Sequence, residues 1–231
     1  MAALSQQIKN GLFVFIFFTI MSFIFATNSH ANTKAPDEIL KANTIKMLQA
    51  INAHRAEIKQ SPKKLTSLVE EIILPHLDFI TASKLVMGKY WRQAEKAQKL
   101  AFIRQFRLLL LRFYSSALTE YLSDKDADLD LNLIHYFPLQ LEAGEKSVTV
   151  RAELQPDTGK AIPIFYRMHM TSKGWKIFDV SVEGVSMITT YKNNFASQFR
   201  AEGIDALIVS LEEKNKQMLV NNHHNSGTKP H

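Results

Sequence analysis

The stretch Ala94–Ser123 contains neither glycine nor proline, and an uninterrupted helix of that length is unusual in a globular protein. Placed on a helix at about 100° per residue, its apolar side chains occupy an arc of roughly 200°. That arc is about twice as wide as the apolar stripe of an ordinary surface helix. We therefore expect this helix to be covered by other elements on more than one side.

Shorter helices are predicted before it. Apolar residues at helical spacing indicate a helix over Ile39–Ile58, and Pro62 marks its end and the start of a second helix. Asp78 is placed to cap a third helix, Phe79–Met87, which Gly88 would end. The N-terminal part of the domain is therefore expected to be helical.

After the long helix the apolar residues alternate with polar ones. The alternation covers residues 129–137, 148–154, 162–170 and 175–182, and short turns containing Gly, Asp or Pro separate the runs. Four such runs predict an antiparallel meander with one strongly apolar face.

The alternation also predicts which side chains share a face. In the first run His135 falls on the apolar side, where a lone histidine is usually a hydrogen-bonded core residue. In the fourth run Phe178 and Val180 are expected on one face, opposite Trp175 and Ile177.

Helical spacing returns at Met187, and Gly203 separates two last helices. Helices followed by an antiparallel sheet predict an α+β domain, with a four-stranded or slightly larger sheet and helices packed on its apolar face. We expect one domain over residues 32–217 and a disordered polar tail over 218–231.

The N-terminus has the pattern of a secretory signal peptide. Lys9 is the one charge in residues 1–10, the apolar run Gly11–Phe25 follows, and the small residues Ser29 and Ala31 suit a cleavage site. The run is shorter than the roughly 20 residues that a membrane-spanning helix needs. We therefore expect cleavage after Ala31 and a soluble product, and export without any cysteine suggests the bacterial periplasm.

The number of cysteines and the spacing of the glycines exclude several kinds of site. The chain has no cysteine, which rules out disulfides and thiolate metal sites. Its eight glycines form neither a GxGxxG nor a GxxxxGK loop, and no GxSxG occurs. His76 and Asp78 give a weak metal or acid–base signal, although helix capping by Asp78 explains it better. Asp179 is expected to be structural, so we predict no enzyme activity, no metal and no cofactor.

The surplus of apolar residues is open to two interpretations. Methionines and aromatic side chains at regular spacing are more often core than ligand pocket, but a cavity between a sheet and its covering helices is physically natural. Periodicity alone indicates an exported α+β domain that could carry an apolar ligand.

Two segments carry short sequence motifs in a specific order and spacing. The first contains Asp78-Phe79-Ile80, Leu85 to Arg92, Phe102, Phe106, Leu110 and Tyr114. The second contains Trp175 to Val180, Glu183 to Met187, Tyr191, Phe195, Gly203-Ile204-Asp205 and Leu207. These segments resemble the N-terminal and C-terminal signatures of the MlaC or toluene-tolerance family of periplasmic phospholipid-binding proteins, and the similarity covers about residues 39–214.

This resemblance implies a periplasmic shuttle with no cofactor, whose cargo is phospholipid. It implies a twisted antiparallel sheet and helices around a deep pocket that takes acyl chains and leaves the headgroup outside. The implied partners are an outer-membrane lipoprotein–porin complex and an inner-membrane ABC transporter complex with its periplasmic substrate-binding subunit.

The expected lipid-binding residues are chosen by two criteria: the face on which each side chain is predicted to lie, and its position in the family to which the chain is similar. They are Phe106, Leu110, Phe113, Tyr114, Val150, Ile164, Tyr166, Met168, Phe178, Val180, Val185, Met187, Ile188 and Tyr191. Lys89 and Arg92, beside two aromatic residues at a helix break, are candidates for partner contact, and solvated surface charge is the alternative.

Two other functions stay open. A periplasmic chaperone or adaptor would bind polypeptide through apolar helical surface. A phospholipid-cleaving enzyme would release fatty acid in a way that depends on one His or Asp.

Overall fold

The computed structural model describes residues 34–123, 127–156 and 159–224. The predicted signal peptide lies outside these ranges. From Ala35 onward the chain forms one compact unit. None of the described helices is both long and apolar enough to cross a membrane.

The N-terminal helices are α2 (Pro36–Ala53), α3 (Arg55–Gln60) and α4 (Pro62–Ile72). The single helix expected over residues 39–58 is therefore wrong. His54 interrupts it with φ −110° and ψ 19°, and its ring Nδ1 lies 3.0 Å from Oε1 of Glu57 in the first turn of α3. This contact joins two side chains across the break, and the His54 side chain does not cap the backbone of α3.

The 3₁₀ turn η1 (Leu74–His76) leads into α5 (Phe79–Met87), α6 (Tyr90–Gln93) and the long α7 (Lys96–Ser123). The predicted cap is confirmed, because Asp78 accepts a 2.9 Å hydrogen bond from the backbone N–H of Thr81. Gly88 ends α5 with φ +55°, a backbone conformation that favours glycine.

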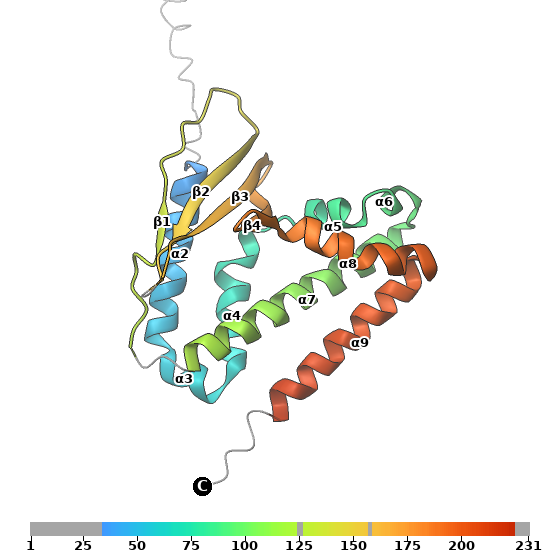
Figure 1. Cartoon of the computed structure of the whole chain (residues 1–231), viewed down its shortest axis with the longest axis horizontal. Coiled ribbons are helices and arrows are strands. Elements are labelled where there is room, and N and C mark those ends of the chain that lie inside the picture. The colour runs from blue at the N-terminus through green and yellow to red at the C-terminus, as the bar shows by residue number, and fades with distance from the viewer. Residues whose placement is uncertain (1–33, 124–126, 157–158, 225–231) are drawn as a thin grey trace, which may run out of the picture. The chain divides into compact units, whose positions relative to one another are not determined.

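Within the described residues, five antiparallel strands pair in sequence order. The predicted meander is confirmed by β1 to β4 (Figure 1). A short fifth strand is added beyond it. The strands are β1 (Ile134–Tyr136), β2 (Ser147–Leu154), β3 (Ile162–Thr171), β4 (Gly174–Val182) and β5 (Val185–Ser186).

The first strand is shorter than expected, and its phase was predicted wrongly. The backbone N–H of Leu133 donates to the carbonyl of Asp130, so this segment is a turn and not a strand. His135 is exposed, while the hydroxyl of the next residue, Tyr136, lies 2.7 Å from that of Thr44 on α2. The alternation inferred from residue 129 therefore placed every side chain of β1 on the wrong face.

The apolar face of the sheet packs against α2. Leu40 of α2 joins Val148 and Val150 of β2, Met168 of β3 and Trp175 of β4 in one buried cluster. The predicted arrangement, helix on the apolar face of an antiparallel sheet, is confirmed. The α+β fold class follows from it.

A β-bulge divides β4. Met168 pairs with Ile177, but the preceding residue of β3 pairs with Asp179, which leaves Phe178 without a partner. The expected common face for Phe178 and Val180 is therefore wrong. Val180 packs with the α2-facing cluster, whereas Phe178 packs with α5 and α7.

The last helices are α8 (Met187–Ala201) and α9 (Gly203–His224). Gly203, with φ +84°, lies at their junction as predicted. Helix α9 passes residue 217, where we placed the end of the domain, because Met218 still packs against the apolar interior. Residues 225–231 of the predicted tail lie outside the described residues.

The described residues bury three apolar clusters, although a domain usually has one contiguous core. The aromatic cluster joins α5, α7, α8 and α9 around Phe102, Phe106, Phe178, Ile188 and Phe199. The helical cluster joins α2, α3, α4 and the end of α7 around Met47, Ile51, Leu65 and Leu122. The sheet cluster is the one that joins α2 to the sheet.

Candidate functional site

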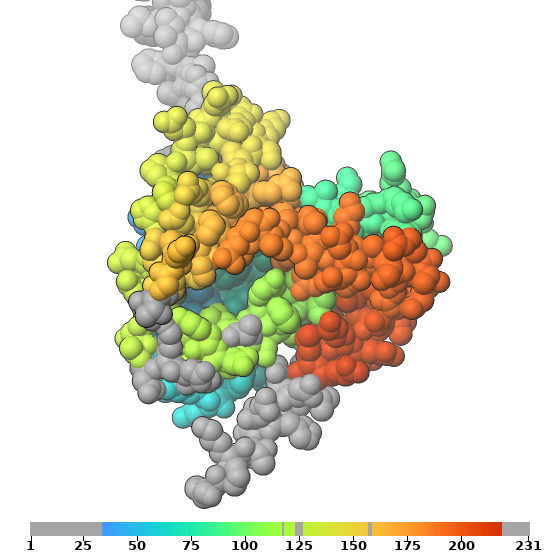
Figure 2. All heavy atoms as spheres, viewed as in Figure 1, coloured from blue at the N-terminus to red at the C-terminus, as the bar shows by residue number. Residues whose placement is uncertain are grey.

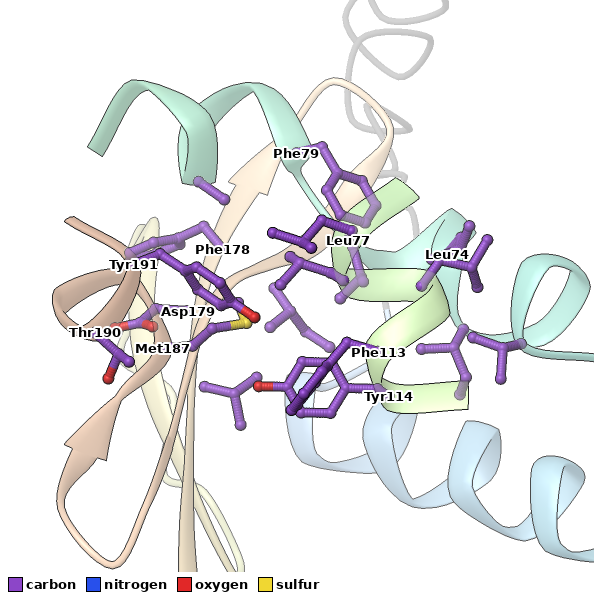
Figure 3. Close-up of a pocket in the computed structure, with 18 of the residues that line it drawn as sticks. Leu74, Leu77, Phe79, Phe113, Tyr114, Phe178, Asp179, Met187, Thr190 and Tyr191 are labelled. Carbon is purple, nitrogen blue, oxygen red and sulfur yellow. The ribbon is translucent and has the colours of Figure 1, made fainter. Parts of the chain in front are cut away.

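A cavity of about 750 Å³ lies between the C-terminal half of α7 and the β3–β4 part of the sheet. Its volume is typical of small-molecule sites, which span roughly 300–1,000 Å³. Most of its wall is aliphatic or aromatic, and Figure 3 shows side chains from α7, α8 and β4 pointing into the same space. In the space-filling view the surface of α7 is visible between the strands and α9 (Figure 2).

The cavity lies where the three clusters meet. The helical cluster contributes Met47, the aromatic cluster contributes Leu110 and Phe178, and the sheet cluster contributes Ile177 and Val180. Each cluster is packed on one side and faces the cavity on the other. The cavity therefore borders all three clusters.

One wall is supported from behind by aromatic rings of α7 and α8, and of these Tyr191 lines the cavity. The ring of Tyr191 lies 5.2 Å from that of Phe106 and 5.6 Å from that of Phe195, measured between centroids. Phe102 stacks on Phe106 at 5.7 Å. Such edge-to-face and offset contacts stabilise a rigid wall on this side of the cavity.

Three tyrosines supply hydroxyl groups without charge. Burial, with a smaller contribution from Tyr114, raises the pKa of Tyr191 to about 12. Burial likewise raises the pKa of Tyr114, and it raises that of Tyr166 well above the ordinary value. All three side chains are neutral at pH 7, so they can donate hydrogen bonds and add no charge to the wall.

Asp179 is fully buried and structural. Its carboxylate accepts a 2.7 Å hydrogen bond from the hydroxyl of Ser186 and a 3.1 Å bond from the backbone N–H of Ile188. Arg167 lies 3.5 Å away. These bonds fasten β4 to the first turn of α8, and that turn places Met187 at the cavity (Figure 3).

Asp78 is held in a second polar group beside the cavity. Besides its bond to the N–H of Thr81, its Oδ2 accepts from the Thr81 hydroxyl at 2.7 Å and lies 2.8 Å from Nε2 of His169. Partial burial alone would raise the pKa of this carboxyl, but these hydrogen bonds outweigh it and hold the pKa below its ordinary value. The carboxylate thus caps α5, as predicted, and also joins this helix to β3.

Exposed apolar side chains mark the opening of the cavity. Phe113 is 50% exposed, Tyr114 51%, Val182 44% and Val185 65%, although all four line the cavity. Thr190, Asn194 and Lys214 are polar lining residues that are themselves exposed. An apolar interior that ends in a polar, partly cationic edge suits a ligand with an apolar body and a charged end.

Most of the residues predicted to bind lipid lie on the cavity wall. They are Leu110, Phe113, Tyr114, Tyr166, Phe178, Val180, Val185, Met187 and Tyr191. The others are buried away from it. Phe106 and Ile188 belong to the aromatic cluster, Val150 and Met168 belong to the sheet cluster, and Ile164 is buried at 8% exposure on β3.

One side of the cavity was missed. Met47 of α2, Val69 of α4, and Ile73, Leu74 and Leu77 around η1 also line it. The only signal for them was the helical apolar stripe of each segment. That stripe has the same form whether it packs against a core or borders a cavity.

Lys89 and Arg92, the candidates for partner contact, are both exposed at the surface, on either side of the start of α6. The described residues contain no group of three His, Cys, Asp or Glu placed to hold a metal ion.

Comparison with known proteins connects this architecture to a family of proteins. The chain is 25% identical over 214 residues to the intermembrane phospholipid transport system binding protein MlaC of Haemophilus influenzae, covering 91% of this chain and 95% of that protein. It is 24% identical over 173 residues to the toluene tolerance protein ttg2D of Pseudomonas putida, covering 74% and 76% of the two chains.

A solved structure has a similar fold. The phospholipid-binding protein of Ralstonia solanacearum, determined in complex with a phospholipid, superposes with a TM-score of 0.68 at 26% identity. The match covers 80% of this chain and 99% of that protein. The family model described as MlaC protein matches residues 41–213. This chain belongs to the MlaC family.

Proposed function

We propose that the protein is a periplasmic carrier of phospholipids. The acyl chains occupy the cavity, and the headgroup lies at its polar edge. The carrier passes lipid between an outer-membrane lipoprotein–porin complex and an inner-membrane ABC transporter complex with its periplasmic substrate-binding subunit, and so maintains the lipid asymmetry of the outer membrane. The family membership and the similarity to phospholipid-binding relatives support this proposal.

The observation that carries the proposal is the open apolar cavity between α7 and the sheet. Burying one methylene is worth about 0.8 kcal/mol, so a lipid with about thirty methylenes resists leaving a bilayer through water by roughly 20 kcal/mol. A cavity that replaces the hydrocarbon environment removes most of that barrier. The wall is suited to this purpose because it is mostly aliphatic and aromatic, and hydrogen bonds within the protein satisfy the carboxylates of Asp78 and Asp179 that border it.

We infer that transfer involves no bond chemistry by the carrier. The carboxylate of Asp78 is occupied by Thr81 and His169, and that of Asp179 by Ser186 and Ile188. Both groups stabilise junctions between elements. The direction of transfer then depends on the partner complexes.

The test is the lipid content of protein purified without detergent. Mass spectrometry of a solvent extract is expected to find phospholipid bound to a substantial fraction of the chains. Met187→Trp, which fills part of the cavity, should lower the ratio of lipid to protein. Val209→Trp, a matched change at an exposed position of α9 outside the cavity, should leave the ratio unchanged.

Wild-type protein without bound phospholipid would contradict the proposal. If such protein instead suppressed the aggregation of unfolded polypeptides, a chaperone would be the better assignment. Release of free fatty acid that is abolished by Asp78→Asn would indicate an enzyme.

A further inference from the structure

The positive charge of the chain is concentrated in one segment. Residues 79–112 contain eight Lys or Arg and one acid, Glu95, which gives a net charge of +7. The whole chain carries +6, so the remaining residues sum to −1. This segment comprises α5, α6 and the first half of α7.

These cations face solvent without acidic partners. Lys84, Lys89, Arg92, Arg104 and Arg107 are all exposed, and no ion pair joins any of them to a carboxylate of the described residues. Elsewhere several cations are paired, such as that of Lys64 with Glu57 at 3.0 Å. The charge of the segment is therefore not neutralised within the described part of the chain.

Two contacts join the three helices into a continuous surface. The guanidinium of Arg107 on α7 lies 5.8 Å from the ring of Phe79 on α5. The ammonium of Lys99 on α7 lies 5.6 Å from the ring of Trp91 on α6. We call the outer side of α5, α6 and the first half of α7 the cationic face.

Exposed apolar side chains are interspersed with these charges. Ile80 is 61% exposed, Leu100 59% and Leu85 38%, and the rings of Tyr90 and Trp91 are only partly buried. Aliphatic and aromatic side chains among Lys and Arg are typical of surfaces that rest in the headgroup region of a bilayer. Beside a bilayer the cations would meet the phosphates while the aliphatic side chains reach the boundary of the acyl chains.

We propose that the cationic face docks the carrier on the surface of bilayers that contain anionic phospholipid. The inference rests on the proposed function, since a phospholipid carrier has to reach lipid surfaces. The face also adjoins the cargo site, because Phe79 contacts Arg107 and lines the cavity. Anionic headgroups supply the complementary charge.

Flotation of the full chain with vesicles tests the proposal. Wild-type protein is expected to bind vesicles of phosphatidylglycerol and phosphatidylcholine, to bind phosphatidylcholine vesicles far less, and to lose binding as salt rises. The triple variant Lys84→Gln, Arg92→Gln, Arg104→Gln should bind about a hundredfold more weakly, at about fivefold for each cation removed near an anionic surface.

The matched control is Lys41→Gln, Lys63→Gln, Lys173→Gln, which removes the same charge from exposed positions outside the face. It should bind nearly as well as wild type. Equal loss in both variants would overturn the proposal in favour of net charge alone, and so would wild-type binding without preference for anionic vesicles. Unchanged vesicle binding by the first variant, with loss of binding to an acidic polypeptide, would instead indicate a protein partner.

Lipid content separates this proposal from the proposed function. None of the three positions in the first variant lines the cavity, so its co-purifying phospholipid should equal that of wild type. Wild-type protein that binds anionic vesicles but never contains phospholipid would contradict the carrier function. It would still support membrane docking by the cationic face.

Discussion

The two halves of α7 are equally apolar in sequence but differ in what they contact. In the first half, Phe102 and Phe106 are fully buried among the aromatic rings of α8. In the second half, Phe113 and Tyr114 are about half exposed and border the cavity. The difference lies in what faces each half, because α8 supplies rings opposite Phe102 and Phe106, whereas the cavity lies opposite Phe113 and Tyr114. One helix thus supports both a solid core and a wall of the cavity.

The largest expected effect on stability comes from a substitution in the first half of α7, which is packed against the rings of α8. Phe106→Ala should lower the free energy of unfolding by about 3–5 kcal/mol, because it leaves a cavity among rings that cannot collapse fully. Denaturant unfolding measures it, and Phe106→Leu, which keeps most of the volume, should cost much less. A loss below about 1 kcal/mol for Phe106→Ala would mean that this half is not solidly packed.

An intermediate effect is expected at the boundary between the halves, where Tyr191 contacts Phe106 and faces the cavity. Its pKa is raised from 10 to about 12, so the folded state holds the phenolic proton more tightly than the unfolded state. This contribution to stability is complete below pH 10 and is lost as the pH rises towards 12.

The variant Tyr191→Phe should therefore lose less stability than wild type between these pH values. Unfolding free energies measured across the alkaline range check this expectation. An identical alkaline loss in both proteins would show that another group is responsible.

The smallest effect on stability is expected for a substitution in the second half of α7, which borders the cavity. Phe113→Ala should change the free energy of unfolding by no more than about 0.5 kcal/mol, because the side chain is already half exposed. It should nevertheless lower the ratio of co-purified phospholipid to protein. Leu100→Ala, an exposed position on the same helix away from the cavity, is the control and should change neither quantity.

Local signals predicted much of the fold. The wide apolar arc of α7, the Asp78 cap, the stop at Gly88 and the hairpin turns of the meander all depend on residues close together in the sequence. The predictions failed where a single residue changes the local geometry. His54 breaks a helix, and the unpaired Phe178 shifts the alternation of β4.

The cavity was less predictable than the fold. Sequence patterns identify which side chains avoid water, and both Phe106 and Leu110 satisfy that criterion. Whether such a side chain touches another side chain or an empty volume depends on distant elements. For that reason Val150 and Met168 are core residues although they share a face with Tyr166, which lines the cavity.

The bulge in β4 has a consequence for the evolution of cargo capacity. A regular strand can direct only every second residue into a given space, yet Ile177, Phe178, Asp179 and Val180 all border the cavity. A one-residue insertion or deletion here would therefore rearrange the wall of the cavity while most of the sheet kept its pairing. Length variation among relatives at this point of the strand would be expected to track the size of the lipids they transport.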